Sequence, residues 1–144
     1  MSYIAPDIAN EKRLQIAEIT LSGSPSAGAY FTFDTLNDHT FNTAPTGLNS
    51  DTLSLPSGSY MFRSCLDITR TSSNHNYQFQ FEVSNTLIGL KGQTGFYNNS
   101  RSGLAEATYE SDASFNLKLK ALAIESQAPT LTSDSKLFIW RVEK

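Results

Sequence analysis

Cysteine and histidine, on which much protein chemistry depends, are almost absent from this sequence of 144 residues. Cys65 is the single cysteine, which excludes an internal disulfide and a zinc site built from the cysteines of one chain. The two histidines, His39 and His75, lie in loop-like stretches, and neither is followed by a second metal ligand two or four positions later. The Gly-x-Ser-x-Gly pattern of a hydrolase nucleophile is also missing. We therefore expect no cofactor, no metal and no enzymatic activity.

Charge and long apolar runs are scarce as well. Charged residues make up 17% of the chain, and 11 basic against 14 acidic residues give a net charge of −3. Because the basic residues are scattered, we expect no binding to nucleic acid. No apolar run approaches the roughly 18 residues of a membrane span, and residues 1–7 lack the basic start and apolar middle of a secretory leader. These absences predict a soluble protein, made in a cytoplasm, with no membrane partner.

Two incomplete patterns also fail to predict a ligand site. Asp34, Asp38 and Asp51 lack the dense one-three-five spacing of a calcium loop. The glycine-rich stretch 89–95 contains Lys91, but neither a Ser or Thr directly after the lysine nor a helix follows, as a phosphate loop requires. We interpret this stretch as the turn of a hairpin after a strand at 86–90.

The residues that are abundant are polar but uncharged, or aromatic. The chain has 19 Ser, 14 Thr and 10 Asn residues, together with nine Phe, six Tyr and one Trp. The aromatic residues supply enough apolar area to offset the entropy lost when a chain of this length is ordered. The length of the chain fits one hydrophobic core, so we expect a single domain. The polar, uncharged composition is typical of β structure, so we expect this domain to be all-β.

Alternation of apolar and polar residues is the dominant pattern. It is clearest at 77–83 and recurs at 60–68 and 115–121, as expected for strands that cover a core on one face. The alternation changes phase at 122–124, which predicts a bulge. Shorter strands are expected at 30–34, 52–55, 86–90 and 104–109, with others at 14–21 and 136–142. About nine strands at near-regular spacing are typical of a sandwich or a barrel.

The closing strand departs from simple alternation. Residues 137–142 are apolar on both faces, so one face covers the core and the other needs a partner. Phe138, Trp140 and Val142 form this second apolar face, which a monomer would leave in contact with water.

The amino-terminal residues 1–13 are interpreted as an arm. Tyr3, Ile4 and Ile8 are its apolar residues. A helical turn capped by Asp7 is the alternative, but the low helix propensity of so short a window favours an extended arm.

A long exposed loop is expected at 92–103. Within it, Phe96, Tyr97, Asn98, Asn99 and Arg101 combine aromatic planes with amide donors, a combination common in surfaces that recognise carbohydrate or protein. The alternative is that Phe96 folds back under the loop and fills the core.

A short motif gives a family resemblance. Leu55-Pro56-Ser57-Gly58-Ser59-Tyr60 resembles the Leu-Pro-x-Gly-x-Tyr start of a central strand in jelly rolls of the tumour-necrosis-factor and complement-head kind. The later order of strands, over roughly residues 14–144, is similar to such domains in bacteriophage fibres and virion decoration proteins. The resemblance implies an antiparallel jelly-roll sandwich of about nine strands. It also implies a homotrimer, because these domains pack three around an axis through the sheet that contains the closing strand.

The expected function is that of a structural virion protein. We expect residues 14–144 to form a trimeric capsid decoration or cement domain, with the arm of residues 1–13 anchoring it to the major capsid protein or another virion protein. We expect the protein to be made in a host cytoplasm and to be located in the virion. The alternative is a receptor- or glycan-binding head of a phage fibre, which would use the 92–103 loop. A chain that starts at Met1 without a shaft favours decoration.

Overall fold

The computed structural model describes residues 13–69, 76–94, 102–125 and 129–143. Within these ranges the chain forms strands and loops only, and none of it is a helix able to span a membrane. The strands are β1 (Leu14–Ser22), β2 (Thr32–His39), β3 (Leu53–Leu55), β4 (Gly58–Asp67), β5 (Asn76–Val83), β6 (Thr86–Gln93), β7 (Ser102–Ser111), β8 (Phe115–Glu125) and β9 (Lys136–Val142).

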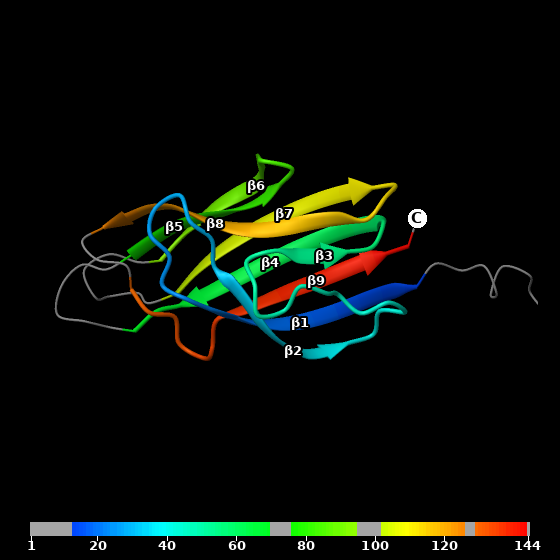
Figure 1. Ribbon diagram of the computed structural model, residues 1–144, viewed down its shortest axis with the longest axis horizontal. Coiled ribbons are helices and arrows are strands. Elements are labelled where there is room, and N and C mark those ends of the chain that lie inside the picture. The colour runs from blue at the N-terminus through cyan, green and yellow to red at the C-terminus, as the bar shows by residue number, and fades with distance from the viewer. Residues whose placement is uncertain (1–12, 70–75, 95–101, 126–128, 144) are drawn as a thin grey trace, which may run out of the picture.

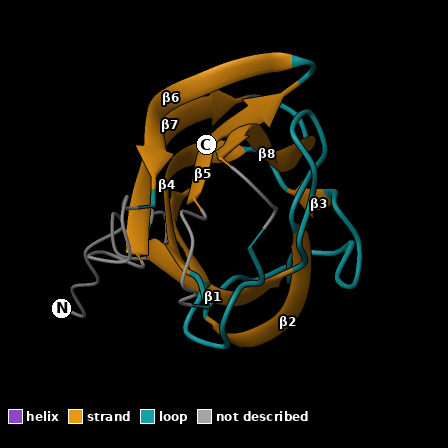
Figure 2. Cartoon of the chain, turned by 90° about the vertical axis from the view of Figure 1, so that its left-hand side faces the viewer, coloured by secondary structure: helices purple, strands orange, loops and turns teal. Residues whose placement is uncertain are grey.

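The strands form two layers. Their order is β2-β1-β9-β4-β7-β6-β5-β8-β3, and all neighbours are antiparallel. We call β2, β1, β9, β4 and β7 the first sheet, and β6, β5, β8 and β3 the second sheet. The two sheets meet at β6 and β7, where Leu90 pairs with Glu106, and the strands curve around the interior (Figures 1 and 2). This is the all-β antiparallel jelly roll that the sequence predicts.

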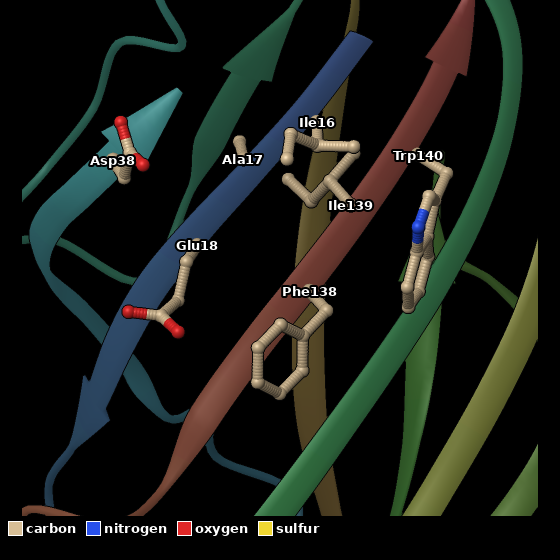
Figure 3. A pocket seen from close by; sticks show the side chains of 7 residues that line it. All are labelled: Ile16, Ala17, Glu18, Asp38, Phe138, Ile139 and Trp140. Atoms are coloured by element: carbon tan, nitrogen blue, oxygen red, sulfur yellow. The ribbon is translucent and has the colours of Figure 1, made fainter. Parts of the chain in front are cut away.

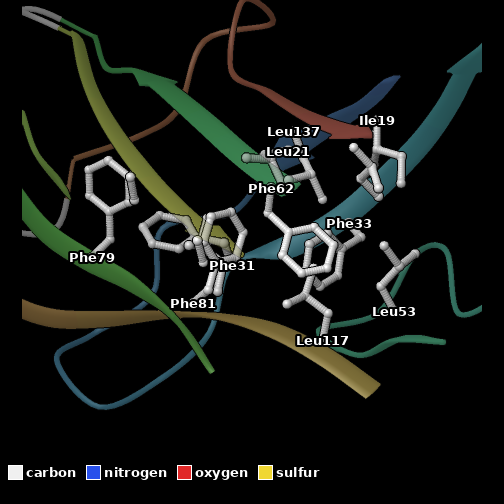
Figure 4. Close-up of a cluster of buried hydrophobic side chains, with 14 of the residues drawn as sticks. Ile19, Leu21, Phe31, Phe33, Leu53, Phe62, Phe79, Phe81, Leu117 and Leu137 are labelled. Atoms are coloured by element: carbon white, nitrogen blue, oxygen red, sulfur yellow. The ribbon is translucent and has the colours of Figure 1, made fainter. Parts of the chain in front are cut away.

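The core between the layers is rich in aromatic side chains. Phe62 of β4 lies 5.6 Å, between ring centroids, from Phe81 of β5 on the opposite layer, and both are fully buried. Phe31 packs edge-on against Tyr77 and Phe79 (Figure 4). In β1, β4 and β9 the buried positions are alternate residues, and in β5 Tyr77, Phe79 and Phe81 are buried, so the inward faces predicted for 60–68 and 77–83 are confirmed.

The motif at 55–60 fixes how β4 begins. The hydroxyl group of Tyr60 donates a hydrogen bond of 2.6 Å to the carbonyl of Pro56, and burial raises the pKa of Tyr60 to about 12. The guanidinium of Arg141 donates to the carbonyl of Ser57 at 2.6 and 3.1 Å. A Cβ atom on Gly58 would lie 2.9 Å from Nε of Arg141, so only glycine leaves room for this arginine. The motif therefore ties the start of β4 to β9.

The predicted bulge is present in β8. Gln78 and Phe79 of β5 pair with Ala123 and Ala121, so Leu122 is the extra residue. This irregularity accounts for the change of phase that the sequence shows at 122–124.

The interpretation of residues 89–95 as a turn is wrong. Strand β6 continues to Gln93, and the hairpin turn lies before it, where Ser84 and Asn85 have φ angles of 51° and 61°. Glycines occur within β6 because the backbone of β7 comes very close: a Cβ atom on Gly89 would overlap the backbone oxygen of Glu106. Strands β6 and β7 also extend into both ends of the expected 92–103 loop, because β6 ends at Gln93 and β7 starts at Ser102.

Two further sequence predictions need correction. The strand expected at 30–34 is divided, because Phe31 donates a backbone hydrogen bond to Leu119 of the second sheet, whereas β2 starts at Thr32 and pairs with β1. The chain thus crosses between the layers at this point. His39 is the last residue of β2, paired with Ala17, and does not lie in a loop. His75 is outside the described residues.

Gly89 and Gly28 allow the close approach of β6 and β7 to be tested. Both have positive φ, 74° and 89°, but a Cβ atom on Gly28 would meet nothing within 4 Å. We predict that Gly28→Ala lowers the free energy of unfolding by about 1–2 kcal/mol, the cost of a left-handed backbone. Gly89→Ala should cost about 1–3 kcal/mol more, because its methyl group overlaps Glu106 and Ala107. Urea unfolding of both variants measures the difference, and equal losses would refute the close approach.

Candidate subunit interface

The outward side of β1, β9, β4 and β7, which we call the outer face of the first sheet, presents several large apolar side chains among polar ones. Strand register places its side chains in rows across the four strands. In the central row Ile16 of β1 pairs with Trp140 of β9, which pairs with Met61 of β4. In the next row Leu14 pairs with Val142. Large apolar side chains from strands far apart in the sequence therefore lie side by side.

Four of these side chains are among the exposed large apolar residues of the described chain. The exposed fraction is 60% for Leu14, 45% for Ile16, 36% for Met61 and 44% for Leu104 of β7. Large contiguous apolar patches are rare on monomeric soluble proteins and mark sites of association. The outer face is therefore the candidate functional surface of the described chain.

Two hollows lie on either side of Trp140. One has a volume of about 240 Å³ and is bordered by Ile16, Phe138 and Trp140, with the carboxylates of Glu18 and Asp38 at its edge (Figure 3). The other, of about 380 Å³, is lined on its apolar side by residues of the same rows, namely Leu14, Met61, Trp140 and Val142. Trp140 therefore projects between two hollows, and such an uneven surface allows the shape complementarity of a well-packed interface.

A charged pair interrupts the apolar rows. Arg63 lies between Phe138 and Glu106 in the register, and its guanidinium is 3.0 Å from the carboxylate of Glu106. The same guanidinium lies 5.8 Å from the centroid of the Trp140 ring, a cation–π contact. Both charges thus already have partners within the subunit, which lowers the cost of removing them from water on association.

Cys65 also lies on the outer face, in the row of Lys136 and Leu104. Burial, and secondarily the negative charge of Asp67, raises the pKa of the Cys65 thiol. The sulfur is therefore protonated at neutral pH, and Cys65 acts as a small half-buried apolar side chain rather than as a nucleophile.

A buried polar network keeps β9 in the middle of the first sheet. The side chain of Arg141, on the core side of β9, donates a hydrogen bond of 2.7 Å to Oε1 of Gln15 in β1. It also reaches Ser57 before β4, and its guanidinium is 3.6 Å from the carboxylate of Glu143. Because one arginine connects β9 to both of its neighbours, the outer face cannot shift its rows without breaking these bonds.

The structure places Phe138, Trp140 and Val142 together on the outer face, half-buried, where the sequence predicts a second apolar face of the closing strand. The sequence prediction of this face did not include Leu14, Ile16 and Met61. Each of them is an apolar residue at an outward position of a strand, where a polar residue is expected, and this pattern could have identified them. The predicted arm residues Tyr3, Ile4 and Ile8 lie outside the described residues, and so do the predicted loop residues, which are Phe96, Tyr97, Asn98, Asn99 and Arg101.

Comparison with known proteins shows the fold but no family. No protein-family model and no curated protein matches the sequence. Among solved structures, murine APRIL at pH 8.5 is similar to this chain with a TM-score of 0.61 and 8% sequence identity, covering 90% of this chain and 99% of that one. The globular domain of zebrafish complement 1qA protein gives a TM-score of 0.60 at 9% identity, covering 91% and 96%. Both likenesses support a jelly roll of the tumour-necrosis-factor and complement-head kind.

If the outer face takes part in self-association, replacing one of its apolar residues by a polar one should reduce that association. Ile16 on this face and Leu87 on the outward side of the second sheet have similar exposure, 45% and 42%. We expect Ile16→Ser to lower the mass measured by light scattering at micromolar concentration. Leu87→Ser is the matched control and should leave the mass unchanged. Equal masses for both variants would contradict a role of the outer face in association.

Proposed function

We propose that this protein is a homotrimeric structural protein whose subunits associate through the outer face of the first sheet, and that the trimer decorates the capsid of a virion. The observation that carries the proposal is the row Ile16–Trp140–Met61 with its neighbours: an apolar surface on the sheet that contains the closing strand.

The size of the apolar surface supports association with further copies of the chain. Complete burial of a large apolar side chain contributes about 1.5–3 kcal/mol, and association costs about 4–15 kcal/mol. Phe138 and Trp140 are already half-buried, so they alone would not offset this cost. Leu14, Ile16 and Met61 are more exposed and add further apolar area. In a closed ring of three copies, rotational symmetry gives every subunit the same contacts, so the face can be covered on all three.

The bonding of the polar side chains supports a structural role, because many of them tie strands and loops together. Asp67 of β4, for example, accepts a hydrogen bond of 2.6 Å from the hydroxyl group of Thr132 in the segment before β9.

The proposed capsid partner is reached through the arm of residues 1–13. Strand β1 starts at Leu14, at the margin of the outer face, so the arm leaves the domain beside the proposed interface. Tyr3, Ile4 and Ile8 would supply its apolar contacts with the major capsid protein or another virion protein. Three arms on one trimer bind together, so a weak contact of each arm gives a long residence time.

Deletion of residues 2–13 tests the anchoring role. We predict that the truncated protein keeps the circular dichroism and the trimeric mass of the full chain, because the described core begins in β1. Its co-sedimentation with capsids should fall strongly, since three contacts are lost at once. Full co-sedimentation of the truncated trimer would refute the arm as the anchor, and loss of the fold would show that the arm is part of the domain.

The copy number in purified particles separates decoration from a fibre head. Decoration predicts hundreds of copies spread over the capsid. A few copies at a vertex or tail would contradict decoration and favour the receptor- or glycan-binding head.

A further inference from the structure

The outward side of the second sheet contains a hollow that differs in chemistry from the outer face of the first sheet. Its volume is about 380 Å³, and we call it the polar hollow. It lies where the β5–β6 turn meets the start of β8. The lining residues are Glu82, Ser84, Asn85, Ser114, Phe115, Asn116 and Lys118. They comprise one carboxylate, one ammonium, two amides, two hydroxyl groups and Phe115, whose ring packs inward against Tyr60 and Tyr109.

Glu82 is a buried acceptor in this hollow. Its side chain is only 5% exposed. One oxygen, Oε2, accepts a hydrogen bond of 2.7 Å from the hydroxyl group of Tyr30, and the other, Oε1, lies 3.6 Å from the ammonium of Lys120. A carboxylate has about four lone-pair positions, so Glu82 retains capacity to accept further hydrogen bonds. Burying a charge is costly, and Tyr30 and Lys120 hold this one in a fixed position.

The other polar groups of the hollow lack strong partners within the described chain. The side chains of Ser84, Asn85 and Ser114 are exposed and make no hydrogen bond to any described residue. Asn116 uses its Oδ1 atom to accept from Ser54 at 3.1 Å, which leaves its amide NH₂ group available as a donor. The hollow therefore presents free donors and acceptors above a fixed carboxylate.

The balance of charge excludes several classes of ligand. A phosphate or other compact anion needs several charged donors, and among the described residues Lys118 is the one cation that lines the hollow. A metal ion would find a single carboxylate. An apolar ligand would leave the amide and hydroxyl groups without hydrogen bonds. A polyhydroxylated molecule supplies both donors and acceptors, and so matches the amide, hydroxyl and carboxylate groups of the hollow.

We propose that the polar hollow binds a small saccharide, with Glu82 accepting hydrogen bonds from its hydroxyl groups while Asn85 and Asn116 donate to its oxygens. The volume is at the lower end of the range of about 300–1,000 Å³ found for ligand sites, which suits one or two sugar rings. The hollow is on the opposite side of the sandwich from the outer face of the first sheet. Its ligand binding is therefore independent of the proposed assembly.

Asn85 offers a substitution that removes a contact without disturbing the backbone. Its φ of 61° is a conformation that glycine adopts freely, so Asn85→Gly keeps the turn. Asn49, exposed in the loop before β3 with a φ of 62°, provides the matched control Asn49→Gly. Both variants should keep the fold, as judged by their amide spectra.

The test uses the full chain, labelled with ¹⁵N, and four separate probes: D-glucose, D-galactose, N-acetyl-D-glucosamine and D-glucuronate. We expect at least one to show saturation transfer and to shift the amide resonances of Ser84, Asn85, Ser114 and Asn116. Asn85→Gly should weaken that binding about tenfold, and Asn49→Gly should leave it unchanged. The proposal is overturned if none of the four probes binds, if the shifts map to another surface, or if Asn85→Gly binds as tightly as the parent.

Discussion

Strand β9 carries apolar side chains on both of its faces, and much of the structure is organised around this feature. Leu137 and Ile139 are buried in the core, whereas Phe138 and Trp140 point away from it. To remove both faces from water requires two apolar surfaces. The second sheet supplies one of them. The other is missing from the isolated subunit, and the proposed trimer supplies it by placing a neighbouring subunit against the outer face.

The positions of β1 and β4, the two strands that flank β9, are fixed by a buried side chain of β9. Arg141 is buried among apolar side chains, where an unpaired charge would be costly, so it is bonded to Gln15 and to the backbone of Ser57. These bonds place β1 and β4 on either side of β9. Ile16 and Met61 then lie beside Trp140 by register alone. The apolar outer face is thus a product of the same arrangement that closes the core.

The two outward surfaces of the sandwich carry different features. The first sheet presents Leu14, Ile16 and Met61 to its surroundings, whereas the second sheet presents the polar hollow around the buried carboxylate of Glu82, beside the exposed Leu87 and Leu90 of β6. Association through one surface leaves the other free. A trimer of this kind would carry three polar hollows on its outside.

Sequence patterns predicted the fold well, because alternation is a local property. Residues 136–142 were expected as a strand and form β9 with the same bounds, and the phase change at 122–124 marks the bulge at Leu122. Properties that depend on distant strands were missed. Gly89 was assigned to a turn because its real constraint, the backbone of Glu106, is far away in the sequence. The polar hollow was missed for the same reason, since the pairing of Glu82 with Lys118 exists only in the folded register.

Trp140 is the only tryptophan of the chain, so its fluorescence reports directly on the outer face. The most direct test of the account is the quenching of this fluorescence by iodide in the full-length protein at micromolar concentration. If neighbouring subunits cover the outer face, Trp140 should be strongly protected from iodide and should emit at short wavelength, as a buried indole does. Quenching at the rate expected for a half-exposed indole would show that the face is open to solvent and would contradict the account.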